Sequence, residues 1–252
     1  MKIKKRFSLI LMLLVIIISM SFTVLADCPD GTTTSWSDGN CTCIATTPNK
    51  VYYLDNDIDC TNYVTSGNGA IKVNADNVTI DCQGHTVSID DIGATGYYYG
   101  ILPDNTNSEF ITIRNCNIDA KNTNDQSRCI LIRAANGTVI NNNITNCNYG
   151  VFISGAYDTV VKNNNIINLT EDLSGADNKG IYVIGSNYVV INNNNFESNS
   201  SYGWAINIKS QSPPSSSYLN ISFNTINDVY QGIYLGWSYS SHVYSNVISN
   251  TH

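Results

Sequence analysis

A short pattern recurs along the chain from about residue 69 to its last residue, and this repetition constrains the fold more than any other feature. Each repeat holds a small residue, an apolar-x-apolar triplet, a β-branched residue and, five places later, another apolar residue. Gly180–Phe196 is representative, with Ile181, Val183, Ile191 and Phe196 at these apolar positions. Apolar residues that alternate at period two place one face of a short strand inward.

Two ladders of apolar residues follow from this alignment, and stacking them in register buries one continuous apolar face. No window has the i, i+3, i+4, i+7 stripe of an amphipathic helix, and a β-sandwich gives no reason for the fixed spacing. The sequence therefore predicts an all-β solenoid of about seven coils. The triplets begin at Ile71, Ile101, Ile130, Val151, Ile181, Ile206 and Ile233, and the β-branched residues are Ile80, Ile113, Val139, Val161, Ile191, Ile221 and Val243.

Asparagine recurs three residues after the β-branched position. Asparagine tolerates the left-handed αL conformation, and its amide can bond to an equivalent amide one coil away. We therefore expect an internal turn in each coil that is closed by a ladder of stacked amides. The residues at this position are Cys116, Asn142, Asn164, Asn194, Asn224 and Asn246.

The N-terminus reads as a secretory signal peptide over residues 1–26, with basic residues, an apolar run and Val24-Leu25-Ala26 before Asp27. An uncleaved anchor helix is the alternative reading of the same run. Residues 27–66 are expected to form a cysteine-rich cap, and residues 67–252 the repeat domain. We predict a secreted, cell-surface or periplasmic protein without a membrane span after cleavage.

Removing the signal leaves an acidic chain. Four of the 13 Lys and Arg residues lie in residues 1–26, so 9 basic residues remain against 20 acidic ones, a net charge of −11. An acidic surface repels nucleic acid, which excludes that class of partner.

Eight cysteines in a chain with a signal peptide predict disulfides. Two pairs can be proposed from the repeat, because Cys82 and Cys116 lie at equivalent turns of adjacent coils and Cys129 and Cys147 lie one coil apart. The pairing within the cap stays open. The cap cysteines are Cys28, Cys41, Cys43 and Cys60.

The segments Asn77–Val87 (NVTIDCQGHTV) and Tyr53–Ile58 (YLDNDI) resemble the first coil of right-handed parallel β-helix proteins. The chain is similar over residues 50–252 to the pectate-lyase-like superfamily, with short repeats like those of NosD-type surface and periplasmic proteins. The resemblance implies a right-handed parallel β-helix. It implies no single activity, because that fold hosts lyases, hydrolases, epimerases and non-enzymes. The polygalacturonase and pectate lyase sequence blocks are missing.

Carboxylates on the long connections between coils are the first group of candidate site residues. Asp90, Asp91, Asp119 and Asp125 could supply a catalytic acid and base, and Glu171, Asp172 and Asp177 could bind Ca²⁺. The alternative is that these connections are acidic only because they are solvated. Asp81 and Arg114 lie at equivalent outward positions of adjacent coils, where we expect a surface ion pair of little energetic value.

Aromatic residues are the second group. The middle residue of each triplet should face outward, which places Phe152, Tyr182 and Tyr234 in one row, with Trp204 and Trp237 beside it. Outward rings suit stacking on sugar rings. They could instead be covered, or could stabilise neighbouring strands through contacts between coils.

These patterns favour a non-catalytic protein that binds glycan or forms part of an extracellular or envelope layer. The alternative function is a polysaccharide-degrading enzyme, either a glycoside hydrolase or a lyase, that uses the loop carboxylates with or without Ca²⁺. The last repeat shows no polar cap, which predicts end-on self-association or a longer parent chain.

Overall fold

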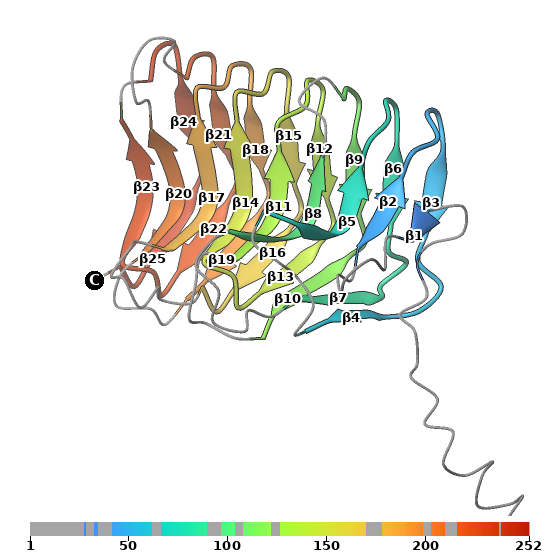
Figure 1. Ribbon diagram of the computed structural model, residues 1–252. Helices are drawn as coiled ribbons and strands as arrows, with labels where there is room; N and C mark the ends of the chain where they lie inside the picture. Colours follow the sequence, from blue (N-terminus) through green and yellow to red (C-terminus); the bar gives the residue numbers. More distant parts are fainter. Residues whose placement is uncertain are drawn as a thin grey trace, which may run out of the picture.

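The protein is a three-sided parallel β-helix in the computed structural model (Figure 1). The structure describes residues 28, 33–34, 42–61, 67–89, 97–103, 108–121, 127–169, 178–198, 203–209, 216–236 and 238–251. Every regular element within these ranges is a strand. The described ranges contain no helix long and apolar enough to cross a bilayer. The predicted fold class is confirmed.

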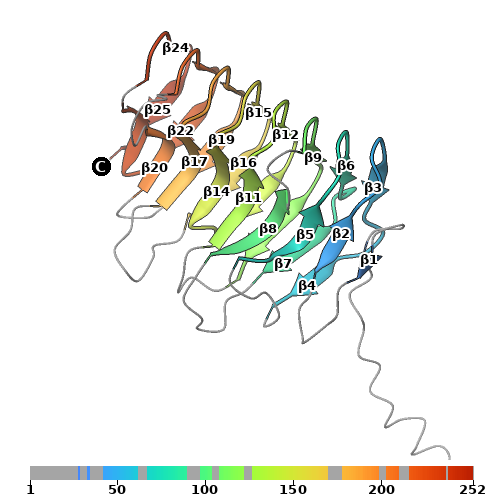
Figure 2. The same cartoon turned by 45° about the horizontal axis from the view of Figure 1, so that its top comes forward.

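Each coil contributes one strand to each of three sheets, and equivalent strands of consecutive coils stack along the rod (Figures 1 and 2). Sheet A contains β1 (Thr33–Thr34), β2 (Cys43–Ala45), β5 (Gly69–Val73), β8 (Tyr98–Pro103), β11 (Ser127–Ile132), β14 (Tyr149–Ser154), β17 (Asn178–Ile184), β20 (Gly203–Lys209) and β23 (Gln231–Leu235). Sheet B contains β3 (Val51–Tyr53), β6 (Thr79–Asp81), β9 (Thr112–Arg114), β12 (Thr138–Ile140), β15 (Val160–Lys162), β18 (Val190–Asn192), β21 (Asn220–Ser222) and β24 (His242–Tyr244). Sheet C contains β4 (Ile58–Cys60), β7 (Thr86–Ile89), β10 (Asn117–Ala120), β13 (Asn143–Thr145), β16 (Asn165–Ile167), β19 (Asn195–Glu197), β22 (Thr225–Asn227) and β25 (Val247–Ser249).

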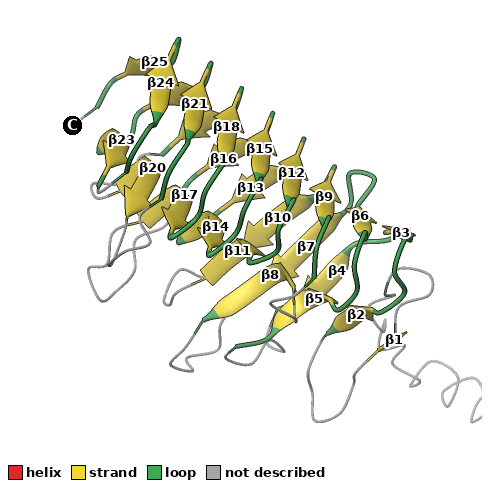
Figure 3. Cartoon of the chain, turned by 90° about the horizontal axis from the view of Figure 1, so that it is seen from above, coloured by secondary structure: helices red, strands yellow, loops and turns green. Residues whose placement is uncertain are grey.

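The pairing is parallel except at the first strand. β1 pairs antiparallel with β2, whose other edge pairs in parallel with β5. β3 and β4 likewise pair in parallel with β6 and β7, so the stacking of coils begins within the segment assigned to the cap. Figure 3 shows the strands of successive coils in parallel rows seen from above.

The core is a column of apolar side chains inside the three sheets, and the predicted ladders form it. Ile71 pairs with Ile101, and the ladder continues through Ile130 to Ile233 on sheet A. Sheet B stacks the predicted β-branched residues in the same way, from Ile80 to Val243. Most of these side chains are buried completely, which stabilises each one by roughly 1.5–3 kcal/mol relative to exposure.

The predicted asparagine ladder is present at the turn between sheets B and C. Asn164 donates through Nδ2 to Asn194 Oδ1 over 2.9 Å, and Asn194 donates in turn to Asn224 Oδ1 over 3.0 Å. The same contact links Asn142 to Asn164 and Asn224 to Asn246. The ladder starts where the Cys116 backbone N–H donates to Asn142 Oδ1.

One detail of the turn differs from expectation. The ladder asparagines are not the residues with positive φ; in each coil the residue before them adopts αL. The ladder is therefore flanked by two further rows of asparagine. One row is formed by the αL residues before it, and the other by the residues after it, which start the strands of sheet C and face outward. Asn195 donates to Asn165 Oδ1, and Asn165 to Asn143 Oδ1, in an outer ladder. We call Asn141–Asn143, Asn163–Asn165 and Asn193–Asn195 the amide edge.

The disulfides in the repeats are confirmed. Cys82 is bonded to Cys116, and Cys129 to Cys147. In the cap, Cys28 is bonded to Cys43, and Cys60 is also disulfide-bonded. Cys41 lies outside the described residues.

The predicted pair of Asp81 and Arg114 is present, but Asp81 is buried rather than on the surface. Arg114 Nε donates to Asp81 Oδ2 over 2.8 Å. Asn115 Nδ2 and the Gln83 backbone N–H both donate to Asp81 Oδ1. A carboxylate in this setting has more partners than an exposed ion pair provides.

Candidate functional site

The outer face of sheet A carries two rows of side chains that run along the rod. The first row holds the residues directly before the small residue of each repeat, and the second holds the middle residues of the triplets. Strand pairing sets both rows in register. We call them together the sheet A face: Tyr99, Arg128, Tyr149, Lys179, Trp204 and Gln231 in the first row, and Lys72, Leu102, Leu131, Phe152, Tyr182, Asn207 and Tyr234 in the second.

Arg128 on β11 lies among aromatic rings. Its guanidinium carbon is 3.5 Å from the ring centroid of Tyr97 and 4.5 Å from that of Phe152. The centroids of Tyr149 and Tyr99 are 5.3 Å and 5.8 Å away. Cations over aromatic faces are attracted by about 0.5–2 kcal/mol per pair, more when water is excluded. These contacts fix the guanidinium in place.

Lys179 on β17 has the same kind of surroundings two strands further along the sheet. Its Nζ is 4.9, 5.0 and 5.1 Å from the ring centroids of Tyr149, Tyr182 and Trp204. The Trp204 indole N–H donates to Gln231 Oε1 on β23. Cations and rings therefore alternate along the first row.

The predicted aromatic row is assembled, but its members differ in exposure. Phe152 is 6% exposed and Tyr182 8%, and their rings stack on each other at 5.3 Å and 16°. Tyr234 is 45% exposed and lies 6.2 Å from Trp204, centroid to centroid. The row is thus closed at Phe152 and Tyr182 and open at Trp204 and Tyr234. Trp237 lies outside the described residues.

The packing of this face changes the acidity of one phenol. Burial raises the pKa of Tyr182 to about 12, and the neighbouring Tyr149 adds to the rise, whereas Arg128 opposes it. The hydroxyl of Tyr182 therefore stays protonated at any physiological pH and can donate a hydrogen bond.

Two polar atoms on this face have no hydrogen-bond partner among the described residues. They are Nε of Arg128, which is 8% exposed, and Oδ1 of Asn207, which is 3% exposed. A buried polar atom without a partner costs about 1–3 kcal/mol. Such atoms are uncommon in folded proteins and call for an explanation.

The charge of the face is opposite to that of the chain. The strands of sheet A contain four cations and no aspartate or glutamate, although the whole chain has a formal net charge of −7. Such local concentration of one sign steers ligands of the opposite sign. The four cations are Lys72, Arg128, Lys179 and Lys209.

Among the carboxylate candidates, Asp119 on β10 is described. Its Oδ1 accepts hydrogen bonds from Thr145 Oγ1 over 3.0 Å and from Asn146 Nδ2 over 2.6 Å, on the outer side of sheet C. The described ranges hold no group of three His, Cys, Asp or Glu side chains that could bind a metal ion. The other candidates lie outside the described residues: Asp90, Asp91, Asp125, Glu171, Asp172 and Asp177.

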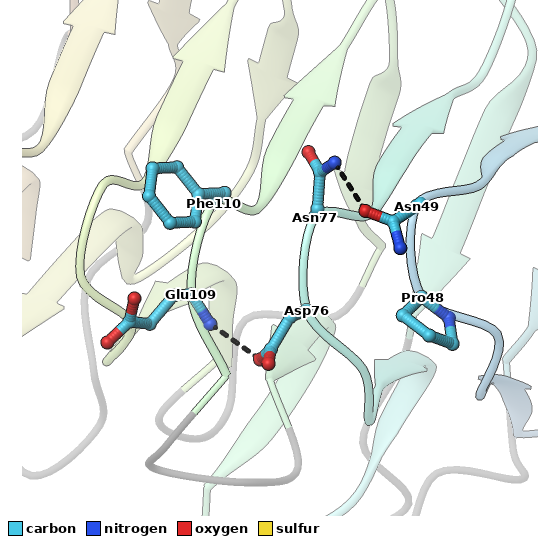
Figure 4. A pocket seen from close by; sticks show the side chains of 6 residues that line it. All are labelled: Pro48, Asn49, Asp76, Asn77, Glu109 and Phe110. Atoms are coloured by element: carbon cyan, nitrogen blue, oxygen red, sulfur yellow. Dashed lines mark hydrogen bonds between the residues drawn. The ribbon is translucent and has the colours of Figure 1, made fainter.

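A concavity lies at the turns between sheets A and B near the start of the rod. It measures about 500 Å³ and is lined by Asn49, Asp76, Asn77, Glu109 and Phe110, together with a proline (Figure 4). The polar groups here are paired with each other: Asn77 Nδ2 donates to Asn49 Oδ1, and the Glu109 backbone N–H to Asp76 Oδ1. This groove offers no buried unpartnered group.

The same row of turns carries exposed rings that the sequence did not single out. Phe110, Tyr188 and Tyr218 have positive φ and are half exposed, at a position that other coils fill with asparagine, aspartate or serine. The rings of Tyr188 and Tyr218 stack face to face at 4.9 Å. Each of these two rings therefore covers one face of the other, and both remain half exposed.

Sequence reasoning also missed Arg128, Lys179 and the role of Asn207. The first two occupy the position before the small residue of each repeat. Read down the alignment, that position gives Tyr99, Arg128, Tyr149, Lys179 and Trp204. An alternation of rings and cations in one register was therefore visible in the sequence.

Comparisons with known proteins agree with the fold. The family described as right handed beta helix region matches residues 58–248. Two mutant tailspike proteins of E. coli bacteriophage HK620, both solved in complex with a pentasaccharide, are similar in structure. One is 16% identical with a TM-score of 0.56, covering 83% of this chain and 39% of the tailspike. The other is 13% identical with a TM-score of 0.55, covering 86% and 45%. The chain thus spans less than half of either tailspike, and no curated protein is similar to it in sequence.

Proposed function

Since the chain belongs to the right-handed β-helix family, a scaffold that presents long regular surfaces, we propose that it is a non-catalytic extracellular or cell-surface protein that binds glycan on the sheet A face. The disulfides fit an oxidising compartment outside the cytosol. Residues 1–26 supply the predicted secretion signal, and their cleavage is part of the proposal.

The observation that carries this proposal is the part of the face around Asn207, beside the exposed ring of Tyr234. Its amide oxygen is buried without a partner, and the neighbouring strands place Tyr182 and Tyr234 directly beside it in register. A sugar offers both complements: hydroxyl groups that donate to an amide oxygen, and C–H faces that pack on aromatic rings. A few convergent polar groups among rings are typical of ligand sites.

The solved relatives support the same class of ligand. The tailspike structures that share this fold contain a bound pentasaccharide. Their low identity extends to this chain no more than the fold, so the ligand class rests on the sheet A face itself.

A glycan array probed with the protein purified in its oxidised form tests the proposal. We expect binding that weakens about tenfold in the Tyr234→Ala variant and in the Asn207→Ala variant, the loss that one buried contact produces. Tyr218→Ala is the matched control, since it removes another half-exposed tyrosine on the same rod. Binding to no glycan, or equal losses in Tyr218→Ala and Tyr234→Ala, would overturn the proposal.

The same samples separate binding from degradation. Bound oligosaccharides are incubated with and without Ca²⁺ and examined by mass spectrometry for shorter products. Intact oligosaccharides are expected. Cleavage products would replace the proposal by the hydrolase or lyase alternative and direct attention to Asp90, Asp91, Asp119 and Asp125.

A further inference from the structure

Arg128 is a nearly buried cation on the sheet A face, and its environment specifies a ligand more closely than the rest of the face. Nη1 donates to the Tyr99 hydroxyl over 3.2 Å, while Nε has no acceptor. The Tyr97 ring lies 3.5 Å from the guanidinium carbon and is itself 40% exposed.

The described residues provide no carboxylate for this guanidinium. The ion pairs in these ranges are Arg114 with Asp81, Lys121 with Asp59 and His85 with Asp57, all outside sheet A. One of these pairs includes the partly exposed guanidinium of Arg114. At Arg128, which is nearly buried and would gain more from a counter-ion, rings take the place of a carboxylate.

This arrangement is costly unless an anion completes it. Rings compensate a guanidinium in part, because their faces are negative, but they accept none of its in-plane N–H bonds. The side of the guanidinium formed by Nε and the adjacent Nη, here called the Nε edge, can pair with a carboxylate through two parallel hydrogen bonds. A guanidinium with its face stacked on rings and this edge unpaired is set for a planar oxyanion.

We infer that Arg128 is the specificity-determining residue of the sheet A face and that the glycan it selects is acidic, with a carboxylate substituent that binds the Nε edge. This inference rests on the proposed function. The absence of carboxylates from the strands of sheet A favours the same ligand, because no fixed negative charge on those strands opposes it. Nucleic acid is not favoured, since the chain as a whole is acidic.

Isothermal titration with three matched probes tests the inference. The probes are an oligouronide, the same oligosaccharide with its carboxyl groups reduced to alcohols, and a sulfated oligosaccharide of the same length. The wild-type protein should bind the oligouronide at least about tenfold more tightly than the reduced form, the difference expected for one charge-assisted bidentate contact. Preference for the sulfated probe over the oligouronide would overturn the assignment of a carboxylate.

Two variants locate the effect. Arg128→Lys keeps the positive charge but loses the planar edge, so the preference for the oligouronide should fall to less than about a third of its value. Lys209→Gln removes one exposed cation from the end of β20 and is expected to retain the preference. A preference that survives in Arg128→Lys, or is lost equally in Lys209→Gln, would overturn the role of Arg128.

The wild-type protein supplies a test that does not depend on the folding of a variant. Hydroxyl-radical oxidation of Tyr97 and Tyr149 should fall when the oligouronide binds and stay unchanged with the reduced probe. Equal binding of the acidic and reduced probes would overturn this inference and leave the proposed function intact. Binding of neither class, on the titration or on a glycan array, would overturn both.

Discussion

The amide edge and the sheet A face lie on the same rod and are built from the same repeat, yet they treat their polar groups in opposite ways. In the amide edge, each ladder asparagine uses its oxygen and its nitrogen: Asn194 accepts from Asn164 and donates to Asn224 and to the Val161 carbonyl. On the sheet A face, Arg128 and Asn207 each hold a buried polar atom that the described residues leave without a partner.

This difference separates scaffold from site. A repeated residue whose hydrogen-bond partners all lie in neighbouring coils stabilises the rod, and its presence needs no further explanation. A residue that departs from the repeat and holds a buried polar atom without a hydrogen-bond partner lowers the stability of the fold. Its presence therefore points to a ligand that supplies the missing partner. The contrast predicts that changes at the amide edge alter unfolding and leave glycan affinity intact, whereas changes on the face do the reverse.

The largest effect on stability is expected between the coils that contain β6 and β9, where a disulfide takes the place of the asparagine ladder. Cys82 and Cys116 are 34 residues apart, and removing a bridge over a loop of this length costs about 3.5 kcal/mol. Denaturant unfolding of Cys82→Ala/Cys116→Ala should show this loss, with glycan affinity within about twofold of wild type. A loss below about 1 kcal/mol would mean that the bridge adds little to the stacked coils.

The hydrogen-bonded part of the same ladder should be nearly as sensitive. Asn194→Ala removes the acceptor for two donors of Asn164 and a donor to Val161, so we expect a loss of about 3 kcal/mol. Asn195→Ala is the matched control, because that side chain is exposed and its loss should cost under about 1 kcal/mol. Equal losses would show that the buried ladder is not special.

The packing of Tyr182 on the sheet A face is expected to have a smaller effect on the free energy of unfolding, and only at alkaline pH. The folded-state pKa of Tyr182 is raised from 10 to about 12, so its stabilising contribution is complete below pH 10 and is lost as the pH rises towards 12. Tyr182→Phe should therefore show a weaker fall in the free energy of unfolding over this range. Identical alkaline profiles for the two proteins would contradict the enclosed packing of this ring.

The smallest expected effect on the free energy of unfolding is the one that Asp81 causes at acid pH. Burial acts to raise the pKa of Asp81, but hydrogen bonds from Asn115, Gln83 and Arg114 outweigh it and lower the pKa below 3.8. The contribution is therefore present above about pH 4 and is lost as the pH falls through the folded-state value. Asp81→Asn should cost about 1 kcal/mol at pH 7, because Arg114 is partly exposed and screened. Its stability should differ less from wild type at pH 2.5.

The features that depend on period alone could be predicted from the sequence. Period fixes which residues stack, so the apolar ladders, the asparagine ladder and the Cys82–Cys116 bridge followed directly. The conformation of single turn residues did not follow: αL falls on Asn193 rather than Asn194, because the residue that reverses the chain precedes the one that points inward.

The site was harder to predict than the fold. Alternation places Phe152 and Tyr182 on the outer face, as expected, but it cannot say that their rings close on each other. Nor does it show that Arg128 lies among four rings drawn from two strands and the residue before β8, since those contacts depend on side-chain rotamers. The exposure of each ring is set by these neighbours.

Hydroxyl-radical footprinting of the protein with a bound oligosaccharide tests the central claim most directly, because it reads both regions in one experiment. The account predicts reduced oxidation of Trp204 and Tyr234 on the sheet A face. It predicts unchanged oxidation of Tyr188 and Tyr218, and of Phe223 beside the asparagine ladder, which are similarly exposed rings on other parts of the rod. Protection of Phe223 or of the Tyr188–Tyr218 stack, with Trp204 and Tyr234 unchanged, would contradict it.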